Sequence, residues 1–178
     1  MTTVTGRILV VHGSEQGSTK DIAEFIAARL RAWGAEADLR DAAELPDVHD
    51  YDAVIVGSAV HDRALLPVVE NFLLRNVEPL EAKPVWLFSV GIGPSLRGPI
   101  GGLLRGAVPP RIAMLRDLVQ PLDYHAFAGV VPRTGSPLLS RVLLRLCGGR
   151  YGDLRDWPEI EAWTTEISHE LSAVMRVA

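Results

Sequence analysis

Short runs of apolar residues, each closed by glycine or serine, alternate along this chain with patterns typical of helices. The clearest runs cover residues 7–12, 51–58 and 84–90. Each run is continuously apolar, as in a strand that is buried on both faces. Such strands belong to parallel sheets, because every connection between parallel strands crosses over one face of the sheet. The sequence therefore predicts an α/β fold built on a parallel sheet.

Two weaker runs complete the predicted sheet. Residues 37–40 are half polar, which favours a strand at an edge, and residues 126–131 form a fifth strand. Apolar residues at helical spacing predict helices over residues 19–33, 66–76, 110–119, 137–147 and 156–175. A short helix within residues 43–51 is expected as the remaining crossover. The predicted architecture is three-layered, with strand order 2-1-3-4-5.

The length of the chain favours one domain. A chain of 178 residues can bury one substantial core, so residues 1–178 are interpreted as a single domain. Residues 94–125 are rich in Gly and Pro and too long for an ordinary connection. We interpret this stretch as an insertion after the fourth strand, with its helix near residues 110–119.

Charge restricts the class of partner. The net charge of −4 argues against a general nucleic-acid binder, which normally carries a basic surplus. Residues 94–150 nevertheless hold eight Arg against two Asp, a local charge of +6. Either this stretch presents a surface that meets an anion, or its arginines are solvated on helix surfaces. The sequence leaves both readings open.

The single cysteine and the N-terminus bear on location. Cys147 allows no disulfide within the chain and no cysteine metal cluster, so we expect no metal site. It lies in an apolar run, where a buried filler is the simpler role and a reactive thiol the alternative. Residues 1–6 lack the layout of a signal peptide, and no run is long enough to span a bilayer. We expect a cytoplasmic protein.

Three loops are expected to form the ligand site. In open parallel sheets, ligands bind outside the carboxyl ends of the strands, where the strand order reverses. Residues 13–19, 58–63 and 89–94 leave such ends and are rich in small residues. The first loop offers hydroxyls and an amide and opens directly onto a helix N-terminus, whose free N–H groups favour an anion. These groups belong to Ser14, Gln16, Ser18 and Thr19.

Other phosphate-binding motifs fit this loop poorly. A Walker loop requires Gly-Lys-Ser/Thr, whereas Lys20 follows the hydroxyls here. A dinucleotide loop requires Gly-x-Gly-x-x-Gly, and the first loop has only Gly13 and Gly17. An ordinary capped turn is the alternative, but one cap explains Ser18 or Thr19 and not the whole cluster. The first loop is therefore predicted to hold a phosphate with neutral donors.

At these residues the sequence resembles the flavodoxin superfamily. Ser14-x-Gln16-Gly17-Ser18-Thr19 is similar to the FMN phosphate loop T/S-x-T/S-G-x-T, with Gln16 as the departure. The resemblance implies an FMN-binding redox protein whose ring lies between the second and third loops. The cofactor-binding residues implied are Ser14, Glu15, Gln16, Gly17, Ser18, Thr19, Ser58, Ala59, Val60, His61, Ser89, Val90, Gly91 and Gly93.

Within that superfamily the layout is similar to menaquinone-dependent protoporphyrinogen oxidases. The shared features are a long insertion after the fourth strand, an apolar helix over residues 141–147, Gly148-Gly149, and Asp156-Trp157 at the last helix. This resemblance implies a tetrapyrrole substrate and a quinone acceptor as partners. The oligomeric state is left open.

The predicted ring site departs from many flavodoxins. Residues 58–63 and 89–94 offer His61 as their one aromatic side chain, whereas many flavodoxins cover the flavin with aromatic rings. An open ring suits a substrate that stacks on it, and the same feature is compatible with weak FMN binding. His61 either touches flavin or substrate, as the one weak catalytic candidate, or is simply exposed. The alternative function is a flavodoxin fold that serves as a non-redox binding or regulatory module.

Residues 97–118 are a candidate contact with a substrate or a membrane. Four arginines could meet tetrapyrrole carboxylates or anionic lipid headgroups near a quinone pool. They are Arg97, Arg105, Arg111 and Arg116. The apolar residues Leu103, Leu104, Ile112, Met114 and Leu115 would pack beside the same ligand. Alternatively, the segment packs on its own domain.

Overall fold

The computed structural model describes residues 6–96, 107–131 and 151–175, and its core is a parallel sheet. The strand order is β2-β1-β3-β5-β6, which matches the predicted order 2-1-3-4-5. All neighbours along this path pair in parallel. The strands are β1 (Arg7–Gly13), β2 (Glu36–Asp41), β3 (Ala53–His61), β5 (Val85–Gly91) and β6 (Asp123–Ala128). Half-polar β2 lies at the edge, as its composition predicts.

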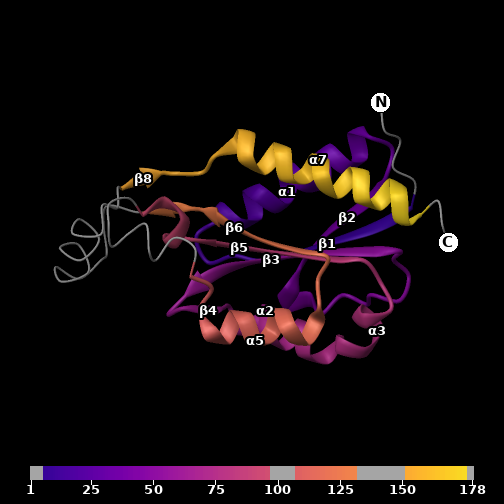
Figure 1. The fold of residues 1–178 in the computed structure, drawn as a ribbon, viewed down its shortest axis with the longest axis horizontal. Coiled ribbons are helices and arrows are strands. Elements are labelled where there is room, and N and C mark those ends of the chain that lie inside the picture. Colours follow the sequence, from indigo (N-terminus) through magenta and orange to yellow (C-terminus); the bar gives the residue numbers. More distant parts are fainter. Residues whose placement is uncertain (1–5, 97–106, 132–150, 176–178) are drawn as a thin grey trace.

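Helices cover both faces of the sheet, giving three layers (Figure 1). One face carries α1 (Ser18–Ala32) and α7 (Trp157–Val174), and the other carries α2 (Pro67–Arg75), α3 (Val77–Glu81) and α5 (Pro110–Val119). Successive strand residues point to opposite faces of the sheet. Because the central strands are continuously apolar, they place apolar side chains on both faces. In β1, for example, Ile8 and Val10 join the α1/α7 core while Leu9 and Val11 join the α2/α5 core.

The segment predicted as an insertion contains an ordinary part of the fold. α5 is the crossover helix between β5 and β6, and it buries Ile112, Leu115 and Val119 against the sheet. Its bounds match the helix predicted over residues 110–119. The crossover from β2 to β3 contains only the short 3₁₀ helix η1 (Ala42–Glu44), where a helix within residues 43–51 is expected.

Two strand ends differ from the prediction. The strand expected at residues 51–58 begins at Ala53 and continues to His61 as β3. The strand expected at residues 126–131 begins at Asp123 and stops at Ala128. After Gly129, β7 (Val130–Val131) pairs antiparallel with β8 (Gly152–Asp153). The helix predicted over residues 137–147, with Cys147 in it, lies outside the described residues.

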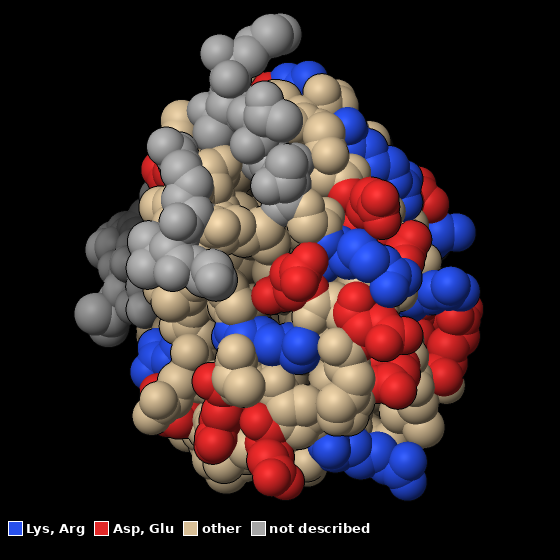
Figure 2. Space-filling model, turned by 90° about the vertical axis from the view of Figure 1, so that its right-hand side faces the viewer, with Lys and Arg blue, Asp and Glu red and all other residues tan. Residues whose placement is uncertain are grey.

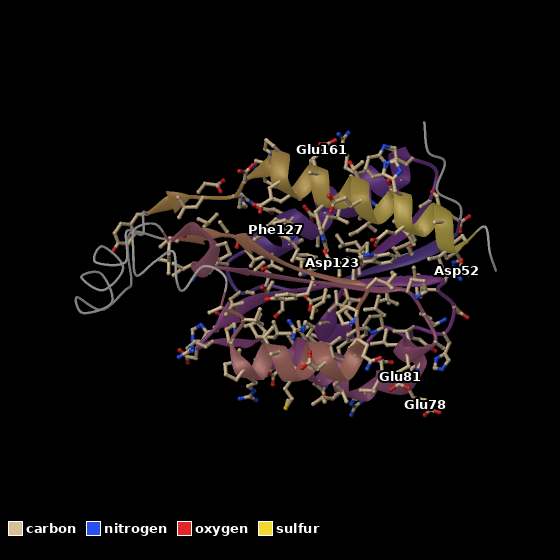
Figure 3. All side chains as sticks on the ribbon, viewed as in Figure 1. Asp52, Glu78, Glu81, Asp123, Phe127 and Glu161 are labelled. Atoms are coloured by element: carbon tan, nitrogen blue, oxygen red, sulfur yellow. The ribbon has the colours of Figure 1, made fainter. Side chains whose placement is uncertain are left out.

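Polar contacts dock α7 on the sheet. The indole of Trp163 donates to Asp123 at 2.5 Å, and that of Trp86 donates to Glu170 at 2.7 Å. Figure 3 shows Asp123 and Phe127 between β6 and α7. The carboxylate of Asp156 accepts the Glu159 amide at 3.2 Å and thereby caps the start of α7.

The edge of the sheet where the strands begin carries mixed charge. Figure 2 shows this side, with blue and red side chains interspersed. Arg7 lies within 4 Å of carboxylate oxygens of Glu36 and Asp38, and its amide bonds the carboxylate of Asp52. The described residues of this side therefore present no continuous basic surface. Among the described helices, none is long and apolar enough to cross a membrane.

Candidate functional site

The three predicted loops leave one edge of the sheet at neighbouring positions. Gly13 at the end of β1 pairs in register with Ser58 of β3, and Ser58 pairs with Ser89 of β5. Because the strands are parallel, the segments that follow these residues emerge side by side. The strand order reverses here, since the chain runs outward from β1 to β2 and then returns to β3. This is the position at which open α/β sheets bind ligands.

The first loop is a tight turn that ends in an uncapped helix. The amide of Gly17 donates to Oγ of Ser14 at 2.9 Å, which closes the turn. Gly17 has φ 91° and occupies the N-cap position without a side-chain hydrogen bond to the helix. Only glycine adopts this left-handed conformation without strain. The first N–H groups of α1 consequently face the loop instead of a capping side chain.

Thr19 is the most informative residue of this loop. It is fully buried in the first turn of α1, and its Oγ1 has no hydrogen-bond partner in the part of the chain that the structure describes. A buried hydroxyl without a partner is uncommon, because its desolvation costs about 1–3 kcal/mol. An acceptor supplied by a ligand would satisfy it. Glu15 and Gln16, by contrast, are exposed.

Gly129 also approaches the first loop. A Cβ placed on it would lie 3.5 Å from Oγ of Ser18 and 2.9 Å from Cγ1 of Val90. Its amide bonds the carbonyl of Gly91 at 3.1 Å. The end of β6 thus packs against the start of α1 and the third loop. Gly129 was not selected from the sequence; the available signal was a glycine inside the strand predicted over residues 126–131.

The second loop is mainly a strand extension. β3 continues through Ala59 and Val60, and a two-residue turn leads into β4 (Ala64–Leu65). Asp62 and Arg63 in the turn have φ of 48° and 63°, both left-handed, as type I′ hairpins require. The expected loop over residues 58–63 is therefore a hairpin that projects beyond the sheet.

Within this hairpin, Ser58 serves the fold. It is fully buried; its Oγ accepts the Leu66 amide at 2.9 Å and donates to the Ala59 carbonyl at 2.8 Å. Both hydrogen bonds engage the Ser58 hydroxyl within the protein, whereas this residue was expected to lie beside a flavin. Ala59 and Val60 follow it and are half-buried, so both are partly accessible to a ligand.

His61 joins the hairpin to the first loop. Its Nδ1 lies 3.6 Å from Oε2 of Glu15, and its Nε2 lies 3.5 Å from Oδ2 of Asp62. The imidazole is 64% exposed, so it lies on the rim of the site. Two of the predicted site residues, Glu15 and His61, are thereby brought together from separate loops.

The third loop contributes backbone and aliphatic surface. Oγ of Ser89 shares a 2.7 Å hydrogen bond with the hydroxyl of Tyr124, so this side chain is engaged within the protein. Burial raises the pKa of Tyr124. Val90 is buried in the α1/α7 core. Gly91 faces the hairpin, since a Cβ on it would lie 3.3 Å from Cβ of Val60.

Beyond Gly91 the chain opens to solvent. Ile92 is 44% exposed, and η2 (Gly93–Ser95) follows it. A Cβ on Gly93 would meet no atom within 4 Å. Ile92 was not selected from the sequence, although it stands between two selected residues. Together with Val60 it gives this part of the site an aliphatic character.

The described arginines of residues 97–118 already have carboxylate partners. Arg111 bonds Glu70 of α2 at 2.9 Å, and Arg116 bonds the adjacent Asp117 at 2.9 Å. Of the apolar residues expected to contact a ligand, Ile112 and Leu115 are buried in the core, while Met114 is 58% exposed. These observations favour packing on the chain's own domain. Arg97, Arg105, Leu103 and Leu104 lie outside the described residues.

The parallel sheet with helices on both faces defines an α/β protein of the doubly wound class. The uncapped start of α1 and the buried hydroxyl of Thr19 lie at the switch point of this sheet, where such folds bind ligands. The family model described as "Flavodoxin domain" matches residues 9–146, and the chain belongs to this family. Protoporphyrinogen IX dehydrogenase [quinone] from Escherichia coli K12 is 20% identical over 174 residues, which cover 92% of this chain and 95% of the relative.

Solved structures show the same fold. A flavodoxin from Pseudomonas aeruginosa matches with a TM-score of 0.57 and 13% identity, over 93% of this chain and 98% of that one. Two-electron reduced flavodoxin from Megasphaera elsdenii matches with a TM-score of 0.53 and 19% identity, over 68% and 85%. Rubredoxin oxygen:oxidoreductase from Desulfovibrio gigas matches with a TM-score of 0.61 and 15% identity, over 99% of this chain but only 37% of its own length. The flavodoxin-like fold is thereby established.

Proposed function

We propose that this chain binds FMN at the carboxyl edge of its sheet and uses it as a redox cofactor. The observation that carries the proposal is the fully buried Oγ1 of Thr19, which has no hydrogen-bond partner among the described residues. It lies in the first turn of a helix that has no side-chain cap. A phosphate ester accepts hydrogen bonds from such hydroxyls and amides, and the helix dipole favours its charge.

The residues present fit FMN. The hydroxyls of Ser14, Ser18 and Thr19 and the first amides of α1 would hold the phosphate. The ring would lie between the β3–β4 hairpin and the segment from Gly91 to Gly93, where the backbone of both can bond its polar edge. When bound, FMN supplies the electron transfer, and the protein supplies binding, orientation and exclusion of water.

We further propose a reduced tetrapyrrole as electron donor and a quinone as acceptor. The support is the resemblance over most of the chain to protoporphyrinogen IX dehydrogenase [quinone] of E. coli. The aliphatic, partly exposed surface of Val60 and Ile92 also suits a flat apolar substrate that lies over the ring. His61, on the rim between two carboxylates, is placed to exchange a proton with such a substrate.

Titration of the apoprotein with FMN tests the cofactor. Saturable quenching of flavin fluorescence is expected for the wild-type chain. The double variant Ser14→Ala/Thr19→Val should bind more weakly by about 3–6 kcal/mol, because hydrogen bonds to a charged group contribute about 1.5–3 kcal/mol each. Thr164→Val is the matched control, since the Thr164 hydroxyl bonds the Ile160 carbonyl inside α7. Absence of saturable binding would favour the non-redox binding module.

A second assay tests the substrate. Under anaerobic conditions, the FMN-loaded protein is mixed with protoporphyrinogen and a soluble quinone, and porphyrin fluorescence is followed. Porphyrin formation above a protein-free control supports the tetrapyrrole proposal. If FMN binds but no porphyrin forms, the substrate proposal is wrong while the cofactor proposal stands.

A further inference from the structure

The side chain of Arg155 makes an unusually complete set of contacts. Its Nε and Nη2 donate to the two carboxylate oxygens of Asp153 at 2.9 and 2.7 Å. Its Nη1 donates to Oδ2 of Asp21 at 2.7 Å. The guanidinium also lies 4.9 Å from the ring centre of Trp157, and the side chain is only 12% exposed. Bidentate contacts of this kind fix a guanidinium in place.

The contact of Arg155 with Asp21 links this guanidinium to the candidate site. Asp21 lies in the first turn of α1, where its amide bonds the carbonyl of Gly17 at 2.9 Å. A phosphate held by Ser18 and Thr19 would occupy the same end of the helix. An uncompensated carboxylate there would repel the phosphate dianion, since charges this close interact appreciably even near the surface.

The nearest lysine does not supply the missing positive charge. Lys20 is in the same turn, but its ammonium pairs with Glu24 at 3.7 Å and is 54% exposed. Solvent and this partner both reduce its effect. Arg155 is more buried and contacts Asp21 directly. Of these two cations, Arg155 is therefore the one placed to neutralise Asp21.

The surroundings of Arg155 hold it against α1. The amide of Leu154 bonds the carbonyl of Gly129 at 3.2 Å, and Gly129 lies against Ser18. On the other side, Trp157 packs on Phe25 of α1 with ring centres 5.3 Å apart. Contacts before and after Arg155 thus fasten the segment to the helix, so the guanidinium is positioned before any ligand arrives.

We propose that Arg155 is a positioning residue that raises the affinity of the first loop for a phosphate ester by offsetting part of the charge of Asp21, while it also pairs with Asp153. The inference rests on the proposed FMN function and adds a long-range determinant of phosphate recognition. Arg155 need not touch the ligand. It acts through Asp21, and its removal should therefore be felt by phosphorylated flavin and not by flavin that lacks the phosphate.

Comparison of FMN with riboflavin isolates this effect, because the two share the ring and differ in the phosphate. Dissociation constants for both are measured with wild-type protein and with Arg155→Met, Asp21→Asn and the double variant. Arg155→Met should weaken FMN about tenfold, as expected for one uncompensated nearby charge, and leave riboflavin within about twofold. The double variant should regain most of the lost FMN affinity. Arg75→Met, an exposed arginine on the opposite face, should change neither constant.

The alternatives are separable. Equal loss of FMN and riboflavin in Arg155→Met, without recovery in the double variant, would overturn the proposal, because Arg155 would then only support the fold. If Arg155→Met does not fold, Asp21→Asn alone decides: FMN binding as tight as wild type or tighter supports the proposal, and weaker binding contradicts it. A wild-type chain that binds neither flavin would instead remove the proposed function, and this inference with it.

Discussion

The amide of Leu66 donates a 2.9 Å hydrogen bond to the hydroxyl of Ser58, across the hairpin that extends β3. Both residues are buried, and the same hydroxyl donates onward to the Ala59 carbonyl. This relationship ties the end of β3 to the start of α2. Ser58 therefore shapes the second loop from within, because its hydroxyl is engaged by the protein's own backbone.

Replacement of Ser58 tests this structural role. Ser58→Ala should destabilise the protein by about 1–3 kcal/mol, because the buried Leu66 amide would lose its acceptor. Urea unfolding followed by circular dichroism measures the change. Ser95→Ala is the control: its hydroxyl bonds the Ile92 carbonyl on the surface, so the expected change is within about 0.5 kcal/mol. Equal stability of the two variants would contradict the assigned role.

Thr19 should show the opposite balance between stability and binding. In the apoprotein its hydroxyl is buried without a partner, so Thr19→Val removes an unsatisfied group at nearly constant shape. The apoprotein should keep its stability or gain up to about 1 kcal/mol. Thermal unfolding with and without excess FMN measures this: the variant should lose most of the stabilisation that FMN confers. A destabilised apoprotein would show that the hydroxyl has a partner in solution.

Close packing leaves no room for a side chain at Gly57. A Cβ on it would lie 2.0 Å from Cζ of Phe88, inside the α1/α7 core. Gly57→Ala should cost about 1–3 kcal/mol or more, since overpacking displaces neighbouring side chains. Gly93→Ala, where a Cβ meets nothing within 4 Å, should be nearly neutral. The free energies of unfolding of both variants, and partial rescue of Gly57→Ala by Phe88→Leu, provide the check.

His12 should make the protein sensitive to acid. It is 6% exposed at the end of β1, and its Nδ1 has no partner. Burial lowers the pKa of His12 below 6.5, and Lys20 acts in the same direction, while Asp41, Glu24 and Glu44 oppose them. The unfolded chain then binds the proton more readily, so stability is complete above pH 6.5 and declines as the pH falls below it.

Unfolding curves at several pH values test this. His12→Leu should flatten the decline in stability between about pH 7 and pH 5, since the titrating group is gone. His169→Leu, on the exposed side of α7, is the matched control and should leave the decline unchanged. An identical decline in wild type and His12→Leu would show that His12 does not contribute to it.

Local patterns predicted the fold well, and they selected three loops that the structure brings to one edge of the sheet. Continuous apolar runs define β1, β3 and β5, and the register of parallel strands then places their ends together. The first loop was identified because its hydroxyls and glycines lie within a few consecutive residues. Signals of this kind depend on neighbouring residues, so one sequence is enough to find them.

Features that depend on unfavoured conformations were not predictable. The hairpin turn uses Asp62 and Arg63 in left-handed conformations, where Asn-Gly is the usual signature. With no glycine present, the sequence gives no indication that β3 continues to His61. Likewise, the buried hydroxyl of Ser58 finds its partner only after the hairpin has formed.

Contacts between distant residues were also missed. Arg155 and Asp21 are 134 positions apart, and no local pattern links them. Arg111 was expected to face a ligand because it lies in an arginine-rich stretch, yet Glu70 of α2 occupies it. Composition indicates that positive charge is present, but only packing shows which carboxylate neutralises it.

The two hydrophobic cores, one on each face of the sheet, contain different aromatic chromophores. Trp86 and Trp163 are buried in the α1/α7 core, and Trp33 and Trp157 pack against it, which accounts for all four tryptophans of the chain. The opposite core contains Tyr51 and Tyr124 instead. Indole emission therefore reports on one side of the sheet alone, so a change confined to α2 and α5 would escape it.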